Sequence, residues 1–309
     1  MAVNLKGKSF LTLKDFSREE LEQILFQGEK LKIEHYGGKD EPLLNGKSIA
    51  VIFEKPSTRT RVSFAVAIHE LGGFPLVLET TNMQMKRGET VPDTARTLGR
   101  YVQGIVARVF AQKTLEELRD YSGVPVINAL SDYSHPCQIM GDLLTIKEKK
   151  GKLEGLKFTY LGDGNNVANS ILFGGSKFGM IVTIGGPSGF EPKSDVVEAA
   201  KKFAEKSGGS VLITNDPVEA VKNADIVYTD VWVSMGQEGG EEKKNVMLPY
   251  QVNRELLEHA KEDVIVMHCL PAHRGEEITD EVIDGPNSVV FDEAENRLHI
   301  QKAILSLLI

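Results

Sequence analysis

The residues best suited to anion binding lie where an apolar segment gives way to a helical pattern. Residues 49–53 are all apolar, and the sequence Ser-Thr-Arg-Thr-Arg follows at residues 57–61. Ser57 is a favourable N-cap, so hydroxyls and a guanidinium would lie beside the exposed N–H groups and the positive dipole end of a helix. The pattern predicts a phosphate site formed by Ser57, Thr58, Arg59 and Thr60.

The two arginines of this segment are not equivalent. Residues two apart are separated by roughly 200° around a helix, so Arg59 and Arg61 cannot easily face one anion. We assign the anion to Arg59 and a supporting role to Arg61. The alternative for the whole segment is an ordinary capped helix with solvated arginines.

Further donors follow other predicted strands of the first half. Arg108 ends the apolar segment 104–108, and the carboxyl end of a parallel strand faces the usual ligand crevice. His135 and Gln138 lie one turn apart near the start of a predicted helix, where they could bind a carbonyl oxygen and an amide. Residues 79–90 form a polar, glycine-containing loop that could carry Gln84 over a ligand, or could be a plain solvated loop.

In the second half, residues 162–167 resemble a dinucleotide-binding turn but lack two of its parts. Val167 occupies the third glycine position, and the following strand ends in Gly185-Gly186-Pro187 with no acidic residue for a ribose. The turn offers asparagines instead, which suit an amino acid, and we select Asn166. Asp230 ends the strand 225–230 and is a candidate to bind an ammonium group.

The segment 264–275 brings His268, Cys269, His273 and Arg274 to the end of a strong apolar strand. A zinc site would need clustered spacing such as Cys-x-x-Cys, which is absent, so we predict neither a metal nor a cofactor. A Cys269–His273 hydrolase pair lacks a supporting nucleophile turn. Cys137 lies two residues from His135 and is expected to be a buried apolar filler.

These residues need a strand–helix alternation to position them, and the sequence has one. Capping signals support it, for example Ser17 with Glu20. We predict an α/β protein of two open parallel-sheet domains with the active site in the cleft between them. The lysine-rich segment 147–152 marks the boundary, which gives domains 1–148 and 149–290 and a C-terminal helix in 291–309. Residues 289–291 are predicted to be a strand.

Composition limits the classes of partner. The chain of 309 residues carries a formal net charge of −8, which argues against nucleic acid as the main partner. No apolar run reaches the ~18 residues of a membrane span, and the first residues lack a signal-peptide core. Two cysteines are too few for a disulfide scaffold and favour a cytoplasmic location.

Four motifs together carry a resemblance to a known family. They are residues 57–61, His135-Pro136-Cys137-Gln138, Asp230 with Ser234-Met235-Gly236, and His268-Cys269-Leu270-Pro271. In this order and spacing they resemble the ornithine carbamoyltransferases, nearly from end to end of the chain. The first motif would fit any carbamoyltransferase, whereas the last two resemble the ornithine branch rather than the aspartate branch.

The resemblance implies an activity and a set of ligand contacts. The implied reaction transfers the carbamoyl group of carbamoyl phosphate to the δ-amine of L-ornithine, in a homotrimer or a multiple of it, and the C-terminal helix would cross back onto the first domain. Gln84 would reach over from its loop, in the same or a neighbouring subunit. Carbamoyl phosphate would contact Ser57, Thr58, Arg59, Thr60, Gln84, Arg108, His135, Gln138, Cys269, Leu270 and Arg297. Ornithine would contact Asn166, Asp230, Ser234 and Met235, and the catalytic residues would be Arg108, His135 and Cys269.

Two other functions remain open at this point. One is a carbamoyltransferase for a related amine, such as putrescine or an acylated ornithine, and residues 234–236 would discriminate it. The other is a non-catalytic phosphate-binding regulator on the same fold. The presence of every expected polar residue argues against the regulator.

Overall fold

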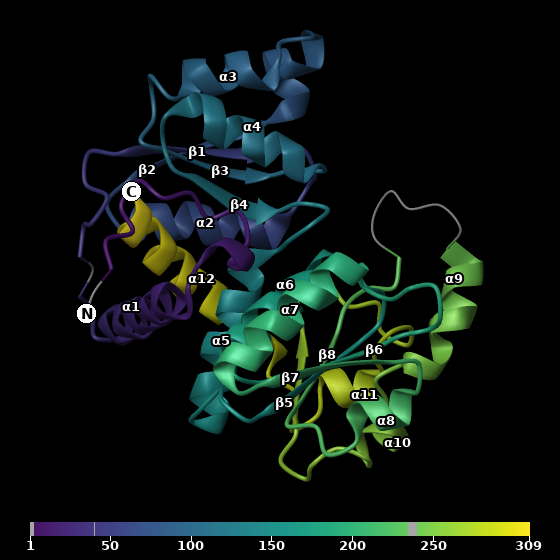
Figure 1. The fold of residues 1–309 in the computed structure, drawn as a ribbon. Helices are drawn as coiled ribbons and strands as arrows, with labels where there is room; N and C mark the ends of the chain where they lie inside the picture. The colour runs from purple at the N-terminus through teal and green to yellow at the C-terminus, as the bar shows by residue number, and fades with distance from the viewer. Residues whose placement is uncertain (1–2, 40, 234–239) are drawn as a thin grey trace. The chain divides into compact units, whose positions relative to one another are not determined.

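The computed structural model describes residues 3–39, 41–233 and 240–309, which form two compact units. Unit 1 comprises Met1–Leu144 and Glu295–Ile309, and unit 2 comprises Thr145–Ala294. The two divisions fall inside helices α5 (Pro136–Lys150) and α12 (Val290–Leu308), so each of these helices belongs to both units. Unit 1 is therefore built from two separated parts of the chain (Figure 1).

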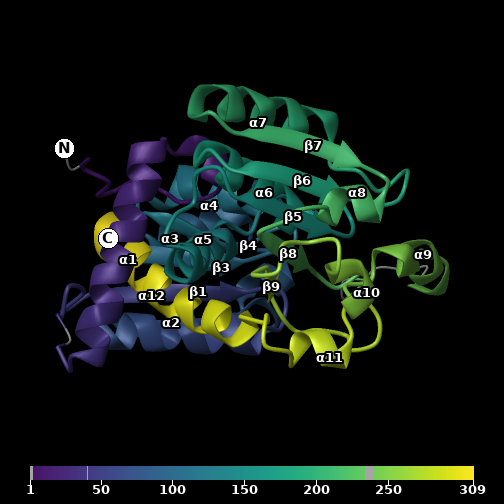
Figure 2. The same ribbon diagram turned by 90° about the horizontal axis from the view of Figure 1, so that it is seen from below.

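Unit 1 has a four-stranded, fully parallel sheet in the order β2-β1-β3-β4. Its central strands are almost completely buried, as expected for a parallel sheet with both faces covered. Helices α3 and α4 cover one face, whereas α1, α2 and α12 lie along the other (Figures 1 and 2). The elements are α1 Arg18–Tyr36, β1 Ser48–Phe53, α2 Thr58–Glu70, β2 Phe74–Glu79, α3 Val91–Leu98, β3 Gly104–Arg108, α4 Gln112–Ser122 and β4 Val126–Leu130.

Unit 2 has a five-stranded, fully parallel sheet in the order β7-β6-β5-β8-β9. Helices α6 and α7 cover one face, and α8, α10 and α11 lie on the other (Figure 1). The strands are β5 Lys157–Leu161, β6 Ile181–Gly185, β7 Ser210–Thr214, β8 Ile226–Thr229 and β9 Ile265–His268. The helices are α6 Asn166–Lys177, α7 Ser194–Ser207, α8 Pro217–Val221, α9 Gly240–Met247, α10 Arg254–Leu257 and α11 Asp280–Ile283.

Both sheets reverse their winding direction at an inner strand. In unit 1 the chain moves outward from β1 to β2 and then returns past β1 to β3, and in unit 2 it does the same around β5 and β8. Loops at the carboxyl ends of strands diverge at such a switch point and leave a crevice for a ligand. The predicted fold class, two parallel-sheet α/β domains, is confirmed.

One local prediction also holds. Ser17 and Glu20 form a complete capping box at α1. The predicted strand at residues 289–291 is wrong, because the chain enters α12 at Val290. Helix α12 packs closely against α5, since a Cβ added to Gly141 of α5 would lie 3.4 Å from the Arg297 backbone nitrogen. Among the described residues, none of the helices is long and apolar enough to cross a bilayer.

Candidate active site

The turn from β1 into α2 has the predicted form. Ser57 is the N-cap of α2, and its hydroxyl accepts a hydrogen bond from the Thr60 backbone N–H. Thr58 is exposed, whereas Thr60 is fully buried at the unit 1 switch point. The first turn of α2 contains no acidic residue that would compete for an anion at its positive end.

Two guanidinium groups converge on the Thr60 hydroxyl. Arg108 at the end of β3 donates from Nη1 at 3.4 Å, and Arg297 of α12 donates from Nη2 at 3.2 Å. Arg297 is 4% exposed and Arg108 is partly buried. Like charges this close repel each other, and a bound anion would relieve the repulsion. The arrangement is thus suited to a phosphate or a developing oxyanion.

His135 adds an uncharged imidazole to this cluster. It is 3% exposed, and burial lowers its pKa well below the usual value, with Arg297 and Arg108 lowering the pKa further. At neutral pH the ring is therefore neutral and can donate one N–H without adding charge. Gln138, in the first turn of α5, donates to Asp142 at 2.9 Å, which fixes its amide.

The cysteine between them is structural, as predicted. Cys137 is fully buried, its thiol donates to the Asn128 carbonyl at 3.3 Å, and burial raises its pKa to about 12. The thiol is therefore protonated and out of reach of solvent at neutral pH.

A pocket of about 310 Å³ lies beside the β1–α2 turn and is lined in part by Ser57, Thr58 and Lys55. Sequence reasoning missed Lys55, whose ammonium lies 4.2 Å from the Phe110 ring centroid. Burial and then the Arg108 charge lower the pKa of Lys55. The feature of the sequence that could have identified Lys55 is its position directly before Pro56, at the end of the strand.

The remaining unit 1 candidates are Arg59 and Gln84. Arg59 is half-buried and forms no ion pair with any residue of the described ranges. Arg61 points to a different partner, Glu79 at 2.6 Å, in agreement with the separation of the two arginines around the helix. Gln84 is exposed in a short 3-10 helix, Gln84–Arg87.

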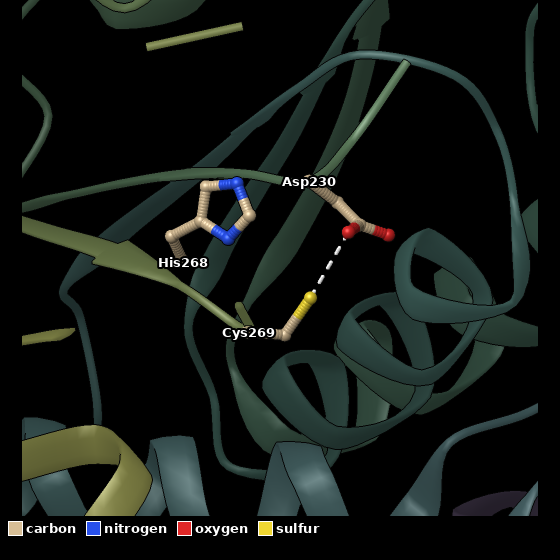
Figure 3. Close-up of side chains that lie close together, drawn as sticks. All are labelled: Asp230, His268 and Cys269. Carbon is tan, nitrogen blue, oxygen red and sulfur yellow. Dashed lines mark hydrogen bonds between the residues drawn. The ribbon is translucent and has the colours of Figure 1, made fainter. Parts of the chain in front are cut away.

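Unit 2 brings Asp230 and Cys269 together at its own switch point. The Cys269 thiol donates to Asp230 Oδ1 at 3.0 Å, as Figure 3 shows. The other carboxylate oxygen accepts from Asn165 Nδ2 at 3.1 Å, and the Val231 N–H donates to Oδ1. Asp230 is 8% exposed and so presents a largely desolvated carboxylate that is suited to an ammonium group.

Two asparagines follow β5 at the start of α6. Asn165 is the N-cap of α6, accepts from the Val167 and Ala168 N–H groups, and also donates to Asp230. Asn166, the residue selected from the sequence, is the first residue of α6. Ser234 and Met235, which were also predicted to contact ornithine, lie outside the described residues.

Asp230, His268 and Cys269 place possible metal-ligand atoms within 4.8 Å of one another (Figure 3). Both ring nitrogens of His268 are already engaged, Nδ1 by the Leu270 N–H and Nε2 by Glu277. In this arrangement the ring has no lone pair to offer a metal ion.

Comparisons with known proteins agree across both units. Residues 8–148 match the family described as aspartate/ornithine carbamoyltransferase, carbamoyl-P binding domain, and residues 154–308 match its Asp/Orn binding domain. The chain is 57% identical to an ornithine carbamoyltransferase of Thermococcus kodakarensis over 308 residues, which cover 99% of this chain and 98% of the relative. It is 56% identical to that of Pyrococcus abyssi over 310 residues, covering 100% and 98%. The solved structure of ornithine carbamoyltransferase from Pyrococcus furiosus superimposes with a TM-score of 0.97 at 54% identity, covering 99% of this chain and 98% of that one.

Proposed function

Because this chain belongs to the aspartate/ornithine carbamoyltransferase family, we propose that it transfers the carbamoyl group of carbamoyl phosphate to the δ-amine of L-ornithine, giving L-citrulline and phosphate. The convergence of Arg108 and Arg297 on Thr60 beside the α2 N-terminus carries the carbamoyl phosphate half of the proposal. The ornithine half is supported by the full-length relatives, which are named as ornithine carbamoyltransferases.

Carbamoyl phosphate is proposed to bind unit 1. The phosphate meets the α2 N-terminus, where backbone N–H groups and the helix dipole favour negative charge. Its contacts are Ser57, Thr58, Arg59, Thr60 and Arg297, with Gln84 reaching over. Arg108, His135 and Gln138 take the carbonyl and amide end. Two of these donors, Arg108 and Arg297, meet at the Thr60 hydroxyl.

The electrostatics of the oxyanion step favour Arg108 and His135 as catalytic residues. Attack on the carbonyl carbon places negative charge on its oxygen, and preorganised donors aimed at that charge are usually the largest catalytic contribution. Neutral His135 donates a hydrogen bond without the desolvation cost of another buried cation. Arg59 and the α2 N-terminus stabilise the departing phosphate.

L-Ornithine is proposed to bind unit 2. Asn166, Asp230, Ser234 and Met235 contact the amino acid, while Cys269 and the Leu270 carbonyl face the reacting amine. Its δ-ammonium group has a pKa near ~10.4 in water, so a proton must leave before attack. The Asp230 carboxylate, which already accepts from Cys269, positions this amine. No cofactor enters this scheme.

The assembly is proposed to be a homotrimer or a multiple of it, in the cytoplasm. The edge strand β2 supports self-association, because Phe74 is 61% and Leu76 is 37% exposed. Light scattering on the purified protein tests the state, and a monodisperse monomer at micromolar concentration would contradict it.

One assay tests the activity. The protein is incubated with carbamoyl phosphate and L-ornithine, and citrulline and phosphate are measured in parallel. We expect equal amounts of both products. Putrescine and an acylated ornithine are assayed in parallel as alternative amines. Faster turnover of either one would identify it, rather than ornithine, as the substrate.

A further inference from the structure

The backbone segment after β9 is closed by a buried His–Glu pair that the proposed chemistry does not use. His268 and Glu277 are both 0% exposed, and Nε2 of the ring lies 3.0 Å from Oε1 of the carboxylate. Both residues belong to unit 2. Cys269 and Leu270 follow His268 directly, so the pair adjoins the residues proposed to face the amine.

The hydrogen bonds define the imidazole tautomer. The Leu270 N–H donates to His268 Nδ1 at 2.8 Å, so Nδ1 is the unprotonated nitrogen. The ring proton therefore lies on Nε2 and is donated to Glu277, because an ionised carboxylate only accepts. The same Glu277 oxygen also accepts from the His273 N–H. The His268 ring therefore links the Glu277 carboxylate to the Leu270 backbone, with one hydrogen bond at each ring nitrogen.

Leu270 needs such support, since its φ is +55°. A leucine rarely adopts this left-handed conformation, and it persists where the surroundings over-determine it. The bond to His268 Nδ1 holds Leu270 from the amino side, while the His273 bond to Glu277 holds the returning chain.

The consequence falls on the Cys269 thiol. The residue before it is anchored through the His268 N–H, which donates to Glu293 at 2.9 Å, and the residue after it is anchored through the ring. With both neighbours fixed, the thiol is aimed at Asp230 Oδ1 at 3.0 Å. Without the acceptor at Nδ1, the Cys269 thiol would no longer be held toward Asp230. Asp230 and its other donors would stay in place.

We propose that His268, oriented by Glu277, is a positioning residue that fixes the Cys269 thiol and the Leu270 backbone for the reacting amine. The effect on turnover rests on the proposed function above. The effect on the thiol does not, because it can be measured without substrates.

Isosteric variants separate the two roles of the ring. In His268→Asn, the amide oxygen overlies Nδ1 and can still accept from Leu270, whereas His268→Gln reaches toward Glu277 but leaves the Leu270 N–H without its acceptor. Glu277→Gln keeps a carbonyl oxygen for both donors, and Glu277→Leu removes it. The control is His299→Asn, because His299 is a second buried histidine paired with a glutamate, at 3.2 Å from Glu295.

The first readout is the alkylation rate of Cys269 by iodoacetamide in the substrate-free protein, with Cys137 protected by burial. The second is kcat and KM for each substrate. We expect His268→Gln and Glu277→Leu to change the alkylation rate and to lower kcat about 10- to 100-fold, as small misplacements of reacting groups do. KM for ornithine should rise more than KM for carbamoyl phosphate. Glu277→Gln should recover most of the activity, and His268→Asn should recover part of it, because the asparagine keeps the Leu270 acceptor but not the contact with Glu277.

Wild-type alkylation and kcat in His268→Gln would overturn the proposal, as would equal losses in Glu277→Gln and Glu277→Leu. A kcat loss in His299→Asn as large as in His268→Gln would also overturn it, because general destabilisation would then suffice. If His268→Gln does not fold, the Glu277 pair carries the same test. If the wild type forms no citrulline, the proposed function fails, and the alkylation rates alone still decide the positioning role.

Discussion

Arg108 offers the sharpest test of the carbamoyl phosphate half-site, through Arg108→Met. The guanidinium is one of two that meet the Thr60 hydroxyl, and it is the one that ends a sheet strand. Removal of one preorganised oxyanion donor costs about 100- to 1,000-fold in turnover, or ~2.7–4 kcal/mol. Methionine keeps much of the apolar stem, so most of this loss should be electrostatic. We therefore expect kcat/KM to fall at least ~100-fold.

The same variant should leave a second signature on His135. Arg108 is one of the charges that lower the pKa of His135, after burial and Arg297. Its removal should raise that pKa, although burial will keep it below the usual value. NMR titration of the His135 ring measures the shift in the substrate-free protein.

The assay is steady-state citrulline formation with carbamoyl phosphate varied at saturating ornithine. The control is Arg119→Met, which removes a partly exposed arginine bonded to Asp120 on α4. Its activity should match the wild type. The reasoning is refuted if Arg108→Met keeps near-normal kcat/KM, or if the pKa of His135 falls rather than rises.

Three further predictions follow from burial and hydrogen bonding. Burial lowers the pKa of both His135 and His299 in the folded protein. Below the histidine pKa of the unfolded chain, near ~6.5, the unfolded chain therefore binds more protons than the folded protein. The free energy of unfolding should then fall as the pH drops through that value. Urea denaturation should show a slope of up to about 1.4 kcal/mol per pH unit for each histidine, reduced in His299→Asn, and a pH-independent midpoint between pH 8 and 5.5 would contradict this. A thiol reagent at pH 8 should modify Cys269 but not Cys137 in the native protein, and both after denaturation; rapid native modification of Cys137 would be inconsistent with its burial. Asn165→Asp should keep the α6 cap but remove the donor to Asp230 and place a second carboxylate beside it, so KM for ornithine should rise and the repulsion should also lower stability. Asn165→Ala should lose the cap and about 0.5–2 kcal/mol. An unchanged KM in Asn165→Asp would speak against the Asp230 contact.

The local sequence signals that succeeded depend on short-range physics. Ser57 caps α2, and the apolar segment before it becomes β1, because a hydroxyl at a helix start and a buried parallel strand leave signatures within a few residues. The strand at residues 289–291 failed for the complementary reason. Three apolar residues fit a strand or a buried helix equally well, and here packing selects the helix.

Long-range geometry was the part that sequence spacing could not supply. Arg297 meets Thr60 from 237 positions away, and only the folded path of α12 makes that contact. The contact between Asn165 and Asp230 likewise spans 65 positions of the sequence. The tautomer of His268 required the position of the Leu270 N–H.

The division of unit 1 into two parts of the chain has a consequence for biosynthesis. Thr60 leaves the ribosome early, but Arg297 follows only after 237 further residues. At 5–20 residues per second the gap is roughly 12 to 47 seconds. Throughout it, the nascent first unit lacks both α12 and one of its two phosphate-site cations, whereas unit 2 emerges without interruption. Unit 2, whose last residue is Ala294, should therefore complete its fold first, and a ribosome-bound chain that has emerged as far as Ala294 should gain protease resistance in unit 2 before unit 1.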